Sequence, residues 1–457
     1  MSPKRSSANG KHHVVIVGGG FGGLGCAQRL AGDPDIEITL IDRNNYHQFQ
    51  PLLYQVATSQ LSPTDIAHSL RGVFADQPNV DVKLAEITGV DTATRTVTTE
   101  DGEAWSGDVL VLAAGSQPNF FHTPGAAENS FPLYSMDDAN RLRSRILGLF
   151  EAVDREPALV ERGALNVVVV GGGPTGVEVA GALADMINVT VPSEYHNLDA
   201  TKAQVCLLDY GDALLKPFSD KAHAYAAKVL HDKGVDIRLG TGVKEVATGH
   251  ALLSDNTVIP TRCVVWGGGI KAAAAAAACS LAQGRGGRVD VQPDLTLPGS
   301  PGVYFLGDIA NLPGPDGKPL PQLGSVALQS GTCAANNILA SLEGKQGKEF
   351  RYHDKGIMAM IGRGAAIAEV GKNHHEIHGE LGHMAWLGVH ASLMTGTRLK
   401  LEAFVDWAWD GFSKTGGPHV LDRGDAAEID WGDDPTVTSS GVTAPRSDGA
   451  QPTKAVP

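Results

Sequence analysis

HVVIVGGGFGG at residues 13–23 and NVVVVGGGPTG at residues 166–176 are two copies of one pattern. In each copy an apolar, mostly β-branched run leads into three glycines, and a helical pattern follows over residues 24–30 and 177–186. An apolar run without polar alternation is typical of a strand buried on both faces. A strand, a glycine turn and a helix in this order form a dinucleotide-binding unit. Its backbone approaches a pyrophosphate, and the helix N-terminus stabilises the pyrophosphate charge.

Each unit is followed by a second strand that ends in an acid, as binding of ribose hydroxyls requires. Residues 36–41 run into Asp42, and residues 204–208 run into Asp209 after a stretch, 188–202, that resembles an insertion. One glycine turn alone is compatible with an ordinary strand-to-helix connection, but two turns in one chain, each with its acid, argue against that interpretation. No arginine is close to Asp209. Because its carboxylate would repel a 2′-phosphate, we expect NADH rather than NADPH at the second turn.

Two further strands indicate which turn holds a flavin. Residues 109–112 lead into a small-residue turn at Ala114 and Gly115, and residues 303–306 lead to Asp308. Ligands of parallel sheets lie at the carboxyl ends of strands, and a permanently bound flavin needs contacts beyond its own glycine turn. We therefore predict FAD at the first turn and NADH at the second. Asp308 is expected to bind the ribityl chain of the flavin, with a surface turn acid as the alternative.

The candidate cofactor contacts fall into two sets. Those expected for FAD are Gly18, Gly19, Gly20, Phe21, Gly22, Gly23, Asp42, Arg43, Ala114, Gly115 and Asp308. Those expected for NADH are Gly171, Gly173, Pro174, Thr175, Gly176, Asp209, Gly268 and Gly269.

The fold class predicted by these patterns is α/β, with two Rossmann-like dinucleotide-binding domains. A helix capped by Ser135 is expected to lead from the FAD domain into an inserted NADH domain. A C-terminal α+β, membrane-facing region is expected to follow. The predicted boundaries are 1–11 for a disordered N-terminus, 12–155 and 272–345 for the two parts of the FAD domain, 156–271 for the NADH domain, 346–423 for the C-terminal region with amphipathic helices, and 424–457 for a disordered tail.

The composition excludes several other classes of protein. A formal net charge of −14 gives no basic surface for a nucleic-acid partner. The five cysteines include no Cys-x-x-Cys pair, so a flavoprotein disulfide reductase is not expected and the thiols are predicted to be reduced. We predict no metal site. The N-terminus has no apolar signal-peptide core, and no apolar run reaches the roughly 18 residues of a spanning helix.

Three stretches resemble the type II, non-proton-pumping NADH:quinone oxidoreductases, a family within the two-dinucleotide-domain flavoproteins. HQFQPLLYQVA at residues 47–57 is similar to the family segment beside the flavin, and GGPTGVE at residues 172–178 is similar to its NADH turn. FRYHDKGIMAMIGR at residues 350–363 resembles the strand pair that opens its C-terminal region. The resemblance extends from about His12 to Gly396.

The resemblance implies roles for further residues. Additional cofactor contacts are expected from Pro51, Gln55, Ile87, Val326 and Ala327. Three residues are expected to take part in catalysis, namely Glu178, Gln329 and Ser325.

Two of these residues also have simpler interpretations. The family glutamate is implicated in orienting substrate or relaying protons, but Glu178 could instead only favour the positive end of its helix. Gln329 could bond flavin or quinone, or be a helix-surface glutamine. In this chain Ser325 occupies the position of the first glutamine of the family motif Ala-Gln-x-Ala-x-Gln-x-Gly. A serine hydroxyl has a shorter reach than a glutamine amide.

The expected activity is hydride transfer from NADH to FAD, followed by two-electron reduction of a quinone such as menaquinone or ubiquinone, without proton pumping. Tryptophans at residues 384–390 and 399–412 fit interfacial helices, which favours a peripheral position on the cytoplasmic side of the cell membrane. The same aromatic residues could instead close a homodimer or pack on the flavin domain. The alternatives are a soluble NADH-dependent flavoprotein reductase of a small protein carrier and a flavin redox sensor.

Overall fold

The computed structural model describes most of the chain between residues 10 and 431. The described residues are 10–279, 281–315, 317–371, 374–394, 396, 400–405, 407, 419–421, 424 and 428–431. The predictions of disorder for the N-terminus and the tail therefore fall mostly outside the described residues. So does much of the amphipathic pattern expected at 399–412.

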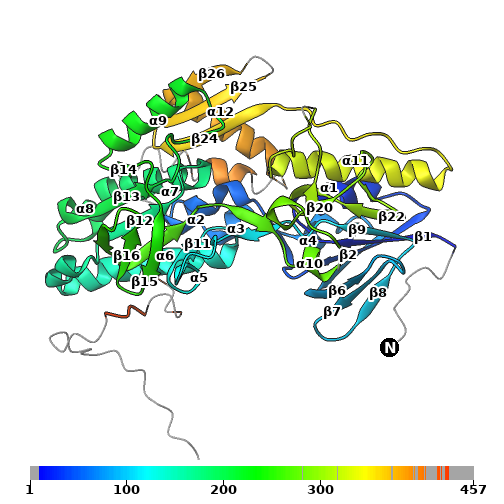
Figure 1. The fold of residues 1–457 in the computed structure, drawn as a ribbon, viewed down its shortest axis with the longest axis horizontal. Helices are drawn as coiled ribbons and strands as arrows, with labels where there is room; N and C mark the ends of the chain where they lie inside the picture. The colour runs from blue at the N-terminus through cyan, green and yellow to red at the C-terminus, as the bar shows by residue number, and fades with distance from the viewer. Residues whose placement is uncertain are drawn as a thin grey trace, which may run out of the picture.

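The first sheet contains the first glycine turn (Figure 1). Its strands lie in the order β21-β22-β9-β1-β2-β5, and all neighbours are parallel except β21 and β22. Their bounds are Thr296–Leu297, Ser300–Phe305, Val109–Leu112, His12–Val17, Ile36–Asp42 and Val80–Leu84. The chain runs outward from β1 to β5 and returns to β9 on the other side of β1. This reversal opens a crevice at the carboxyl ends of β1 and β9, where nucleotides bind in such sheets.

Helices cover one face of this sheet and a small antiparallel sheet lies beside it. Helix α1 (Phe21–Leu30) packs along α11 (Gly324–Leu342). A Cβ at Gly331 would lie 2.1 Å from the Gly22 carbonyl oxygen, so the two helices meet backbone to backbone. The small sheet consists of β6 (Ile87–Asp91), β7 (Thr96–Thr99) and β8 (Ala104–Ser106).

The second sheet contains the second glycine turn and is parallel throughout. Its order is β11-β18-β12-β13-β14, with bounds Phe131–Pro132, Cys263–Trp266, Asn166–Val170, Gln204–Leu208 and Asp236–Arg238. Alternate residues of β12 face opposite cores: Val167 and Val169 pack in the core shared with the helices, and Val168 packs in a smaller one. This sheet is buried on both faces, as its uninterrupted apolar strands predict.

Helices and a second antiparallel sheet supply these two cores. The helices are α6 (Met136–Arg155), α7 (Pro174–Asp185) and α9 (Asp220–Asp232). The strands are β15 (Val243–Ala247), β16 (His250–Leu253) and β17 (Val258–Pro260). Ser135 caps α6 in a capping box with Asp138, which confirms the predicted cap.

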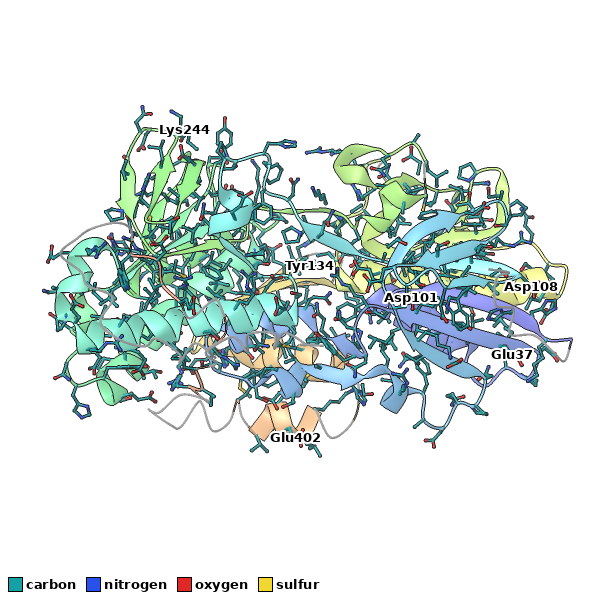
Figure 2. The ribbon with its side chains drawn as sticks, turned by 90° about the horizontal axis from the view of Figure 1, so that it is seen from below. Glu37, Asp101, Asp108, Tyr134, Lys244 and Glu402 are labelled. Atoms are coloured by element: carbon teal, nitrogen blue, oxygen red, sulfur yellow. The ribbon has the colours of Figure 1, made fainter. Side chains whose placement is uncertain are left out.

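The C-terminal region packs on the second sheet's helices. It consists of an antiparallel sheet, β24 (Gly356–Gly362), β25 (Ala365–Val370) and β26 (His375–His378), followed by α12 (Gly379–Leu393). Residues 400–405 are helical again, and Figure 2 shows Glu402 on this helix at the outer edge of the molecule. Trp431 returns to the second sheet, where the guanidinium groups of Arg162 and Arg262 lie 5.6 and 5.7 Å from its ring centroid.

The remaining elements are short connections. They are β3 (Tyr46–Gln48), η1 (Gln50–Leu52), α2 (Leu53–Ala57), α3 (Pro63–Ile66), β4 (Ala67–Ser69), α4 (Leu70–Val73), β10 (Ser116–Pro118), α5 (Ala126–Asn129), η2 (Pro157–Arg162), the π-helical η3 (Met186–Thr190), α8 (Val191–Glu194), η4 (Ala200–Lys202), β19 (Ile270–Ala272), α10 (Ala275–Ala278), η5 (Arg285–Gly287), β20 (Val289–Asp290), η6 (Gly307–Ile309) and β23 (Ala310–Asn311). None of the helices in the described part of the chain has the length and apolar character needed to cross a membrane. The predicted α/β class with two parallel nucleotide-binding sheets is confirmed.

Candidate functional site

The two glycine turns obey the same steric constraint. Gly18 has φ = 101° and Gly171 has φ = 108°, a region that favours glycine. A Cβ at Gly18 would lie 2.3 Å from the Ala113 carbonyl oxygen, and one at Gly171 would lie 2.4 Å from the Gly267 carbonyl oxygen. Each turn therefore sits directly against the end of the neighbouring strand, β9 or β18.

The later glycines of each turn serve two other purposes. A Cβ at Gly23 would lie 1.8 Å from the Gly18 oxygen, and one at Gly176 would lie 1.7 Å from the Gly171 oxygen, so the helix folds back tightly on its turn. Gly20 and Gly173, by contrast, have no atom within 4 Å of the position of a Cβ. Both are extended caps of helix N-termini, and the open space beside them fits a pyrophosphate that approaches the backbone.

The two predicted acids hold the two turns in the same way. Asp42 Oδ2 accepts the Gly19 N–H at 2.6 Å, and Oδ1 accepts the Asn44 N–H at 2.7 Å. Asp209 repeats this arrangement, with both carboxylate oxygens accepting backbone N–H groups at 2.5 Å. Burial raises the pKa of Asp42, although these N–H donors and Arg43 lower it. Each carboxylate keeps lone pairs for ribose hydroxyls, because two oxygens offer about four acceptor sites.

Asp308 lies in a buried hydroxyl network at the crevice of the first sheet. Ser116 Oγ donates to Asp308 Oδ2 at 2.8 Å and lies 2.7 Å from the Tyr134 hydroxyl. Burial raises the pKa of Asp308 and of Tyr134, and the Asp308 charge raises that of Tyr134 further. Figure 2 shows Tyr134 near the middle of the molecule, where the two sheet-bearing halves meet. Our sequence reasoning missed Ser116 and Tyr134 as site residues. Tyr134 stands beside the predicted cap Ser135, but nothing local indicates that its hydroxyl reaches Ser116.

Glu178 lies on α7, under the C-terminal sheet. Its Oε1 accepts the Met360 N–H of β24 at 3.2 Å. Its side chain keeps some solvent-exposed surface, yet protein atoms surround the carboxyl group closely. This desolvation raises the pKa of Glu178 to about 8, against the opposing effects of the Met360 N–H and the Trp386 indole. A carboxyl group with this pKa is mostly protonated at neutral pH and can donate a proton.

Gln55 is 3% exposed and is bonded within the protein. Its Nε2 donates to the Tyr54 hydroxyl at 3.1 Å, and its Oε1 accepts the Trp407 indole N–H at 2.9 Å. Gln55 therefore ties α2 to the helical segment that contains Trp407.

Ser325 and Gln329 lie on one side of α11 and contact the segment before β24. Ser325 Oγ lies 2.9 Å from the Tyr352 hydroxyl. Gln329 accepts the His353 N–H at 2.9 Å and donates to the His353 carbonyl at 3.0 Å. Gln329 therefore makes a structural bond that we did not predict, and its expected ligand contact stays a prediction.

The other predicted residues occupy varied positions. Val326 and Ala327 are buried, and a Cβ at Gly307 would lie 3.0 Å from that of Ala327, so α11 begins against the turn that carries Asp308. Ile87 is the first residue of β6 and packs against the hydrophobic core of the first sheet. Phe21 and Gly22 begin α1, Pro174 and Thr175 begin α7, and Pro51 lies in η1. The others follow the ends of β2, β9 and β18, namely Arg43, Ala114, Gly115, Gly268 and Gly269.

Neither a disulfide nor a metal centre is found in the part of the chain that the structure describes. All five thiols are free, which agrees with the prediction of reduced cysteines. Burial raises the pKa of the Cys26 and Cys263 thiols to about 12, so they are inert at neutral pH. Among the residues that the structure describes, no group of His, Cys, Asp or Glu side chains could hold a metal ion.

Two parallel sheets, each with a glycine turn and an acid, define a flavoprotein with two dinucleotide-binding domains. Residues 12–331 match the model of the pyridine nucleotide-disulphide oxidoreductase family. Type II NADH:quinone oxidoreductase Ndh of Mycobacterium tuberculosis is 38% identical over 412 residues, 87% of this chain and 87% of that protein. NdhA, a second such enzyme of that organism, is 36% identical and covers 89% of this chain and 88% of its own length.

Solved structures agree with this fold. NDH2 from Plasmodium falciparum, in complex with NADH, superimposes with a TM-score of 0.81 at 18% identity and covers 90% of this chain and 100% of that one. The chain therefore belongs to the type II NADH:quinone oxidoreductases, within the pyridine nucleotide-disulphide oxidoreductase family. It is an NADH dehydrogenase of the quinone-reducing kind, with FAD as its cofactor and NADH as its electron donor.

The duplicated turn predicts two separable binding defects. Replacing Gly23 by Ala places a Cβ against the Gly18 carbonyl, and we expect the purified variant to lose FAD absorbance. Replacing Gly176 by Ala creates the same clash in the second turn. This variant should keep FAD but should no longer be reduced by NADH at concentrations that saturate the wild type. Gly388→Ala, where a Cβ meets nothing within 4 Å, is the control. Loss of FAD from the Gly176 variant alone would reverse the assignment of the turns.

Proposed function

We propose that the first glycine turn holds FAD, that the second receives NADH, and that electrons leave to a quinone at a membrane surface. The proposal rests mainly on the free space beside Gly20 and Gly173, where no atom lies within 4 Å of the position of a Cβ. In each turn an aspartate also accepts a backbone N–H of the neighbouring glycine. When bound, FAD supplies the redox chemistry, accepting hydride from NADH and passing two electrons to the quinone.

The network of Asp308, Ser116 and Tyr134 supports placing FAD at the first turn. It adds polar groups at the carboxyl end of β9, on the sheet that contains the first turn. Asp308 and Ser116 would bond the ribityl hydroxyls of FAD. At the second turn, the Asp209 carboxylate would accept the ribose hydroxyls of NADH and repel the 2′-phosphate of NADPH.

Glu178 would hold a proton close to the reacting nucleotides. It lies at the start of the second turn of α7, shortly after the second glycine turn, and burial keeps its carboxyl group protonated at neutral pH. Quinone reduction consumes two protons as well as two electrons, so a protonated acid at this place suits the reaction.

The C-terminal helices offer a surface for peripheral membrane attachment. On the inner side of α12, Trp386 and His390 stack with ring centroids 3.9 Å apart, and they pack against Tyr54 and Phe49. Helix α12 and the helical segment 400–405 also expose apolar side chains, namely Leu381, Met384, Val389, Leu393, Leu401, Phe404 and Val405. Exposed apolar side chains that gather on helices are typical of a membrane or subunit interface. We propose that this surface contacts the cytoplasmic leaflet of the cell membrane. The alternative is that it forms the contact between the subunits of a homodimer.

The direct test of quinone reduction is an anaerobic stopped-flow experiment. NADH should bleach the flavin absorbance, and menaquinone or ubiquinone analogues should then restore it at a rate that accounts for steady-state turnover. Bleaching without fast reoxidation by any quinone would reject the quinone-reductase proposal. It would instead favour a protein carrier as the acceptor, or a sensor.

Replacing Glu178 by Gln should slow quinone turnover and leave FAD bound. We expect a loss of about tenfold or more, since general acids contribute at least this much. Wild-type turnover should fall as the pH rises through about 8, because the carboxyl group then loses its proton, and this limb should vanish in the variant. The pH dependence of kcat in both proteins is the measurement. Glu245→Gln, on the exposed surface of β15, is the control, and an unchanged pH profile in the Glu178 variant would exclude the proposed role.

Replacing Phe404 by Glu should weaken membrane attachment, since it places a charge on the exposed apolar surface. Phe404 is 56% exposed. We expect less co-sedimentation with anionic lipid vesicles, with FAD content unchanged. Leu84→Glu changes a leucine that is 58% exposed and lies on β5, away from α12, and it should have no effect. A shift from dimer to monomer in sedimentation analysis, with vesicle binding intact, would assign the surface to self-association instead.

A further inference from the structure

One side of α7 lies along the outer edge of β24. Glu178, Gly181 and Asp185 occupy positions i, i+3 and i+7 of the helix, so they share this side. In the described part of the chain β24 is an edge strand, and an edge strand presents N–H groups that its own sheet leaves unpaired. Two N–H groups along this edge donate to α7. Met360 donates to Glu178 at 3.2 Å, and Arg363, in the turn after β24, donates to Asp185 at 2.7 Å.

Between these two bonds the helix and the strand touch main chain to main chain. A Cβ at Gly181 would lie 2.0 Å from the Ile361 carbonyl oxygen. The register of β24 against β25 shifts at the same place, between Met360 and Gly362. Such an irregularity bends a strand and re-aims its backbone. Because no side chain lies between the helix and the strand here, the hydrogen bonds on either side of Gly181 set how closely β24 approaches α7.

The bond at Asp185 belongs to a buried ion pair. Asp185 Oδ2 accepts the Arg363 N–H, and its Oδ1 pairs with the ammonium group of Lys233 at the end of α9. The two side chains are only 10% and 18% exposed. The stem of Lys233 also covers Gly362, where a Cβ would lie 2.4 Å from Cε. One carboxylate thus joins α7, α9 and the turn of β24, and loss of either charge would leave the other one buried without a partner.

Glu178 lies two helical turns from this ion pair, under the same strand. Burial is the largest cause of its raised pKa, and the Met360 N–H acts in the opposite direction. If β24 moved away from α7, water would reach the Glu178 carboxyl group and the Met360 bond would be lost. The first change lowers the pKa and the second raises it. Because burial is the larger effect, the pKa would fall toward the ordinary value of a glutamate.

Other titratable groups surround this contact, namely Tyr54 on α2, His383 and His390 on α12, and Lys233. His383 Nδ1 lies 3.2 Å from the sulfur of Met360. Burial lowers the pKa of His390 to about 4, so its imidazole is neutral at neutral pH. The pKa of Glu178 is shifted by burial and by two hydrogen bonds rather than by a charge on these groups. The distance between β24 and α7 is therefore the property that controls it.

We propose that the Asp185–Lys233 ion pair positions β24 over Glu178 and thereby keeps water away from the Glu178 carboxyl group. The inference rests on the proton-holding role of Glu178 proposed above and adds the residues that maintain it. Asp185 and Lys233 are positioning residues, because their effect reaches Glu178 through the strand.

Asp185→Asn keeps the size of the side chain and an oxygen that can accept the Arg363 N–H, but it removes the charge that pairs with Lys233. We expect the alkaline limb of kcat, near pH 8 in the wild type, to move down by about one pH unit. At about pH 7.5 this shift lowers the protonated fraction, and hence kcat, about threefold. At more acidic pH kcat should stay close to that of the wild type. Lys233→Met should move the limb in the same direction.

Amide hydrogen exchange of residues 357–363 gives a second measurement that does not depend on turnover. Exchange should become faster in both variants, because β24 is held less closely to α7. Asp232→Asn is the matched control, since it breaks the exposed Lys228–Asp232 pair on the same helix and should change neither the exchange nor the pH profile.

Faster exchange with the alkaline limb still near pH 8 would show that the ion pair only stabilises the fold, and the proposal would be wrong. Unchanged exchange in both variants would also overturn it. If Asp185→Asn does not retain FAD, Lys233→Met decides, because it leaves Asp185 bonded to Arg363. If Glu178→Gln keeps the alkaline limb, the proposed role of Glu178 has failed and the inference falls with it, whatever the exchange of β24 shows.

Discussion

The structure depends on the close approach of two glycine turns to the ends of neighbouring strands. At Gly18 and Gly171 the backbone passes so near to a carbonyl oxygen of another strand that no Cβ has room. That contact fixes where each helix begins, and the helix N-terminus then fixes where a pyrophosphate can lie. The acids follow from the same constraint, because Asp42 and Asp209 accept N–H groups of the turns themselves. Sheet, helix, acid and ligand space thus form one unit that occurs twice.

Identical units do not by themselves separate a resident flavin from a passing nicotinamide. The difference arises outside the repeat. Asp308 and Ser116 extend the first crevice with buried polar groups, whereas the second turn is followed at once by Glu178 under the C-terminal sheet. The first nucleotide would therefore have contacts along its length, as a permanently bound cofactor needs. The second would have its reacting end beside a protonated acid, as a substrate needs. The same unit can thus hold a resident cofactor in one copy and a substrate in the other, because different side chains pack against each copy.

Local patterns predicted most of this architecture, and long-range contacts account for what they missed. The strands Asn166–Val170 and Gln204–Leu208 have the bounds that their apolar runs indicate, and Ser135 caps its helix as its capping box predicts. By contrast, Tyr352 meets Ser325 across 27 positions and Met360 meets Glu178 across 182. No periodicity encodes such pairs. Gln329 shows the limit of prediction from local sequence, because we expected this glutamine to bind a ligand and did not foresee its bond to the main chain of His353.

The same device that builds the nucleotide turns also assembles the larger units. A Cβ at Gly331 would meet the Gly22 carbonyl oxygen at 2.1 Å, and one at Gly181 would meet the Ile361 carbonyl oxygen at 2.0 Å. The first contact joins α11 to α1, and the second joins β24 to α7. Both are contacts between main chains, so rotamer changes cannot relax them, and any larger residue must shift an element. Ser325 and Glu178 lie on the two helices positioned in this way. These two glycines therefore act as contact points that join α11 to α1 and β24 to α7.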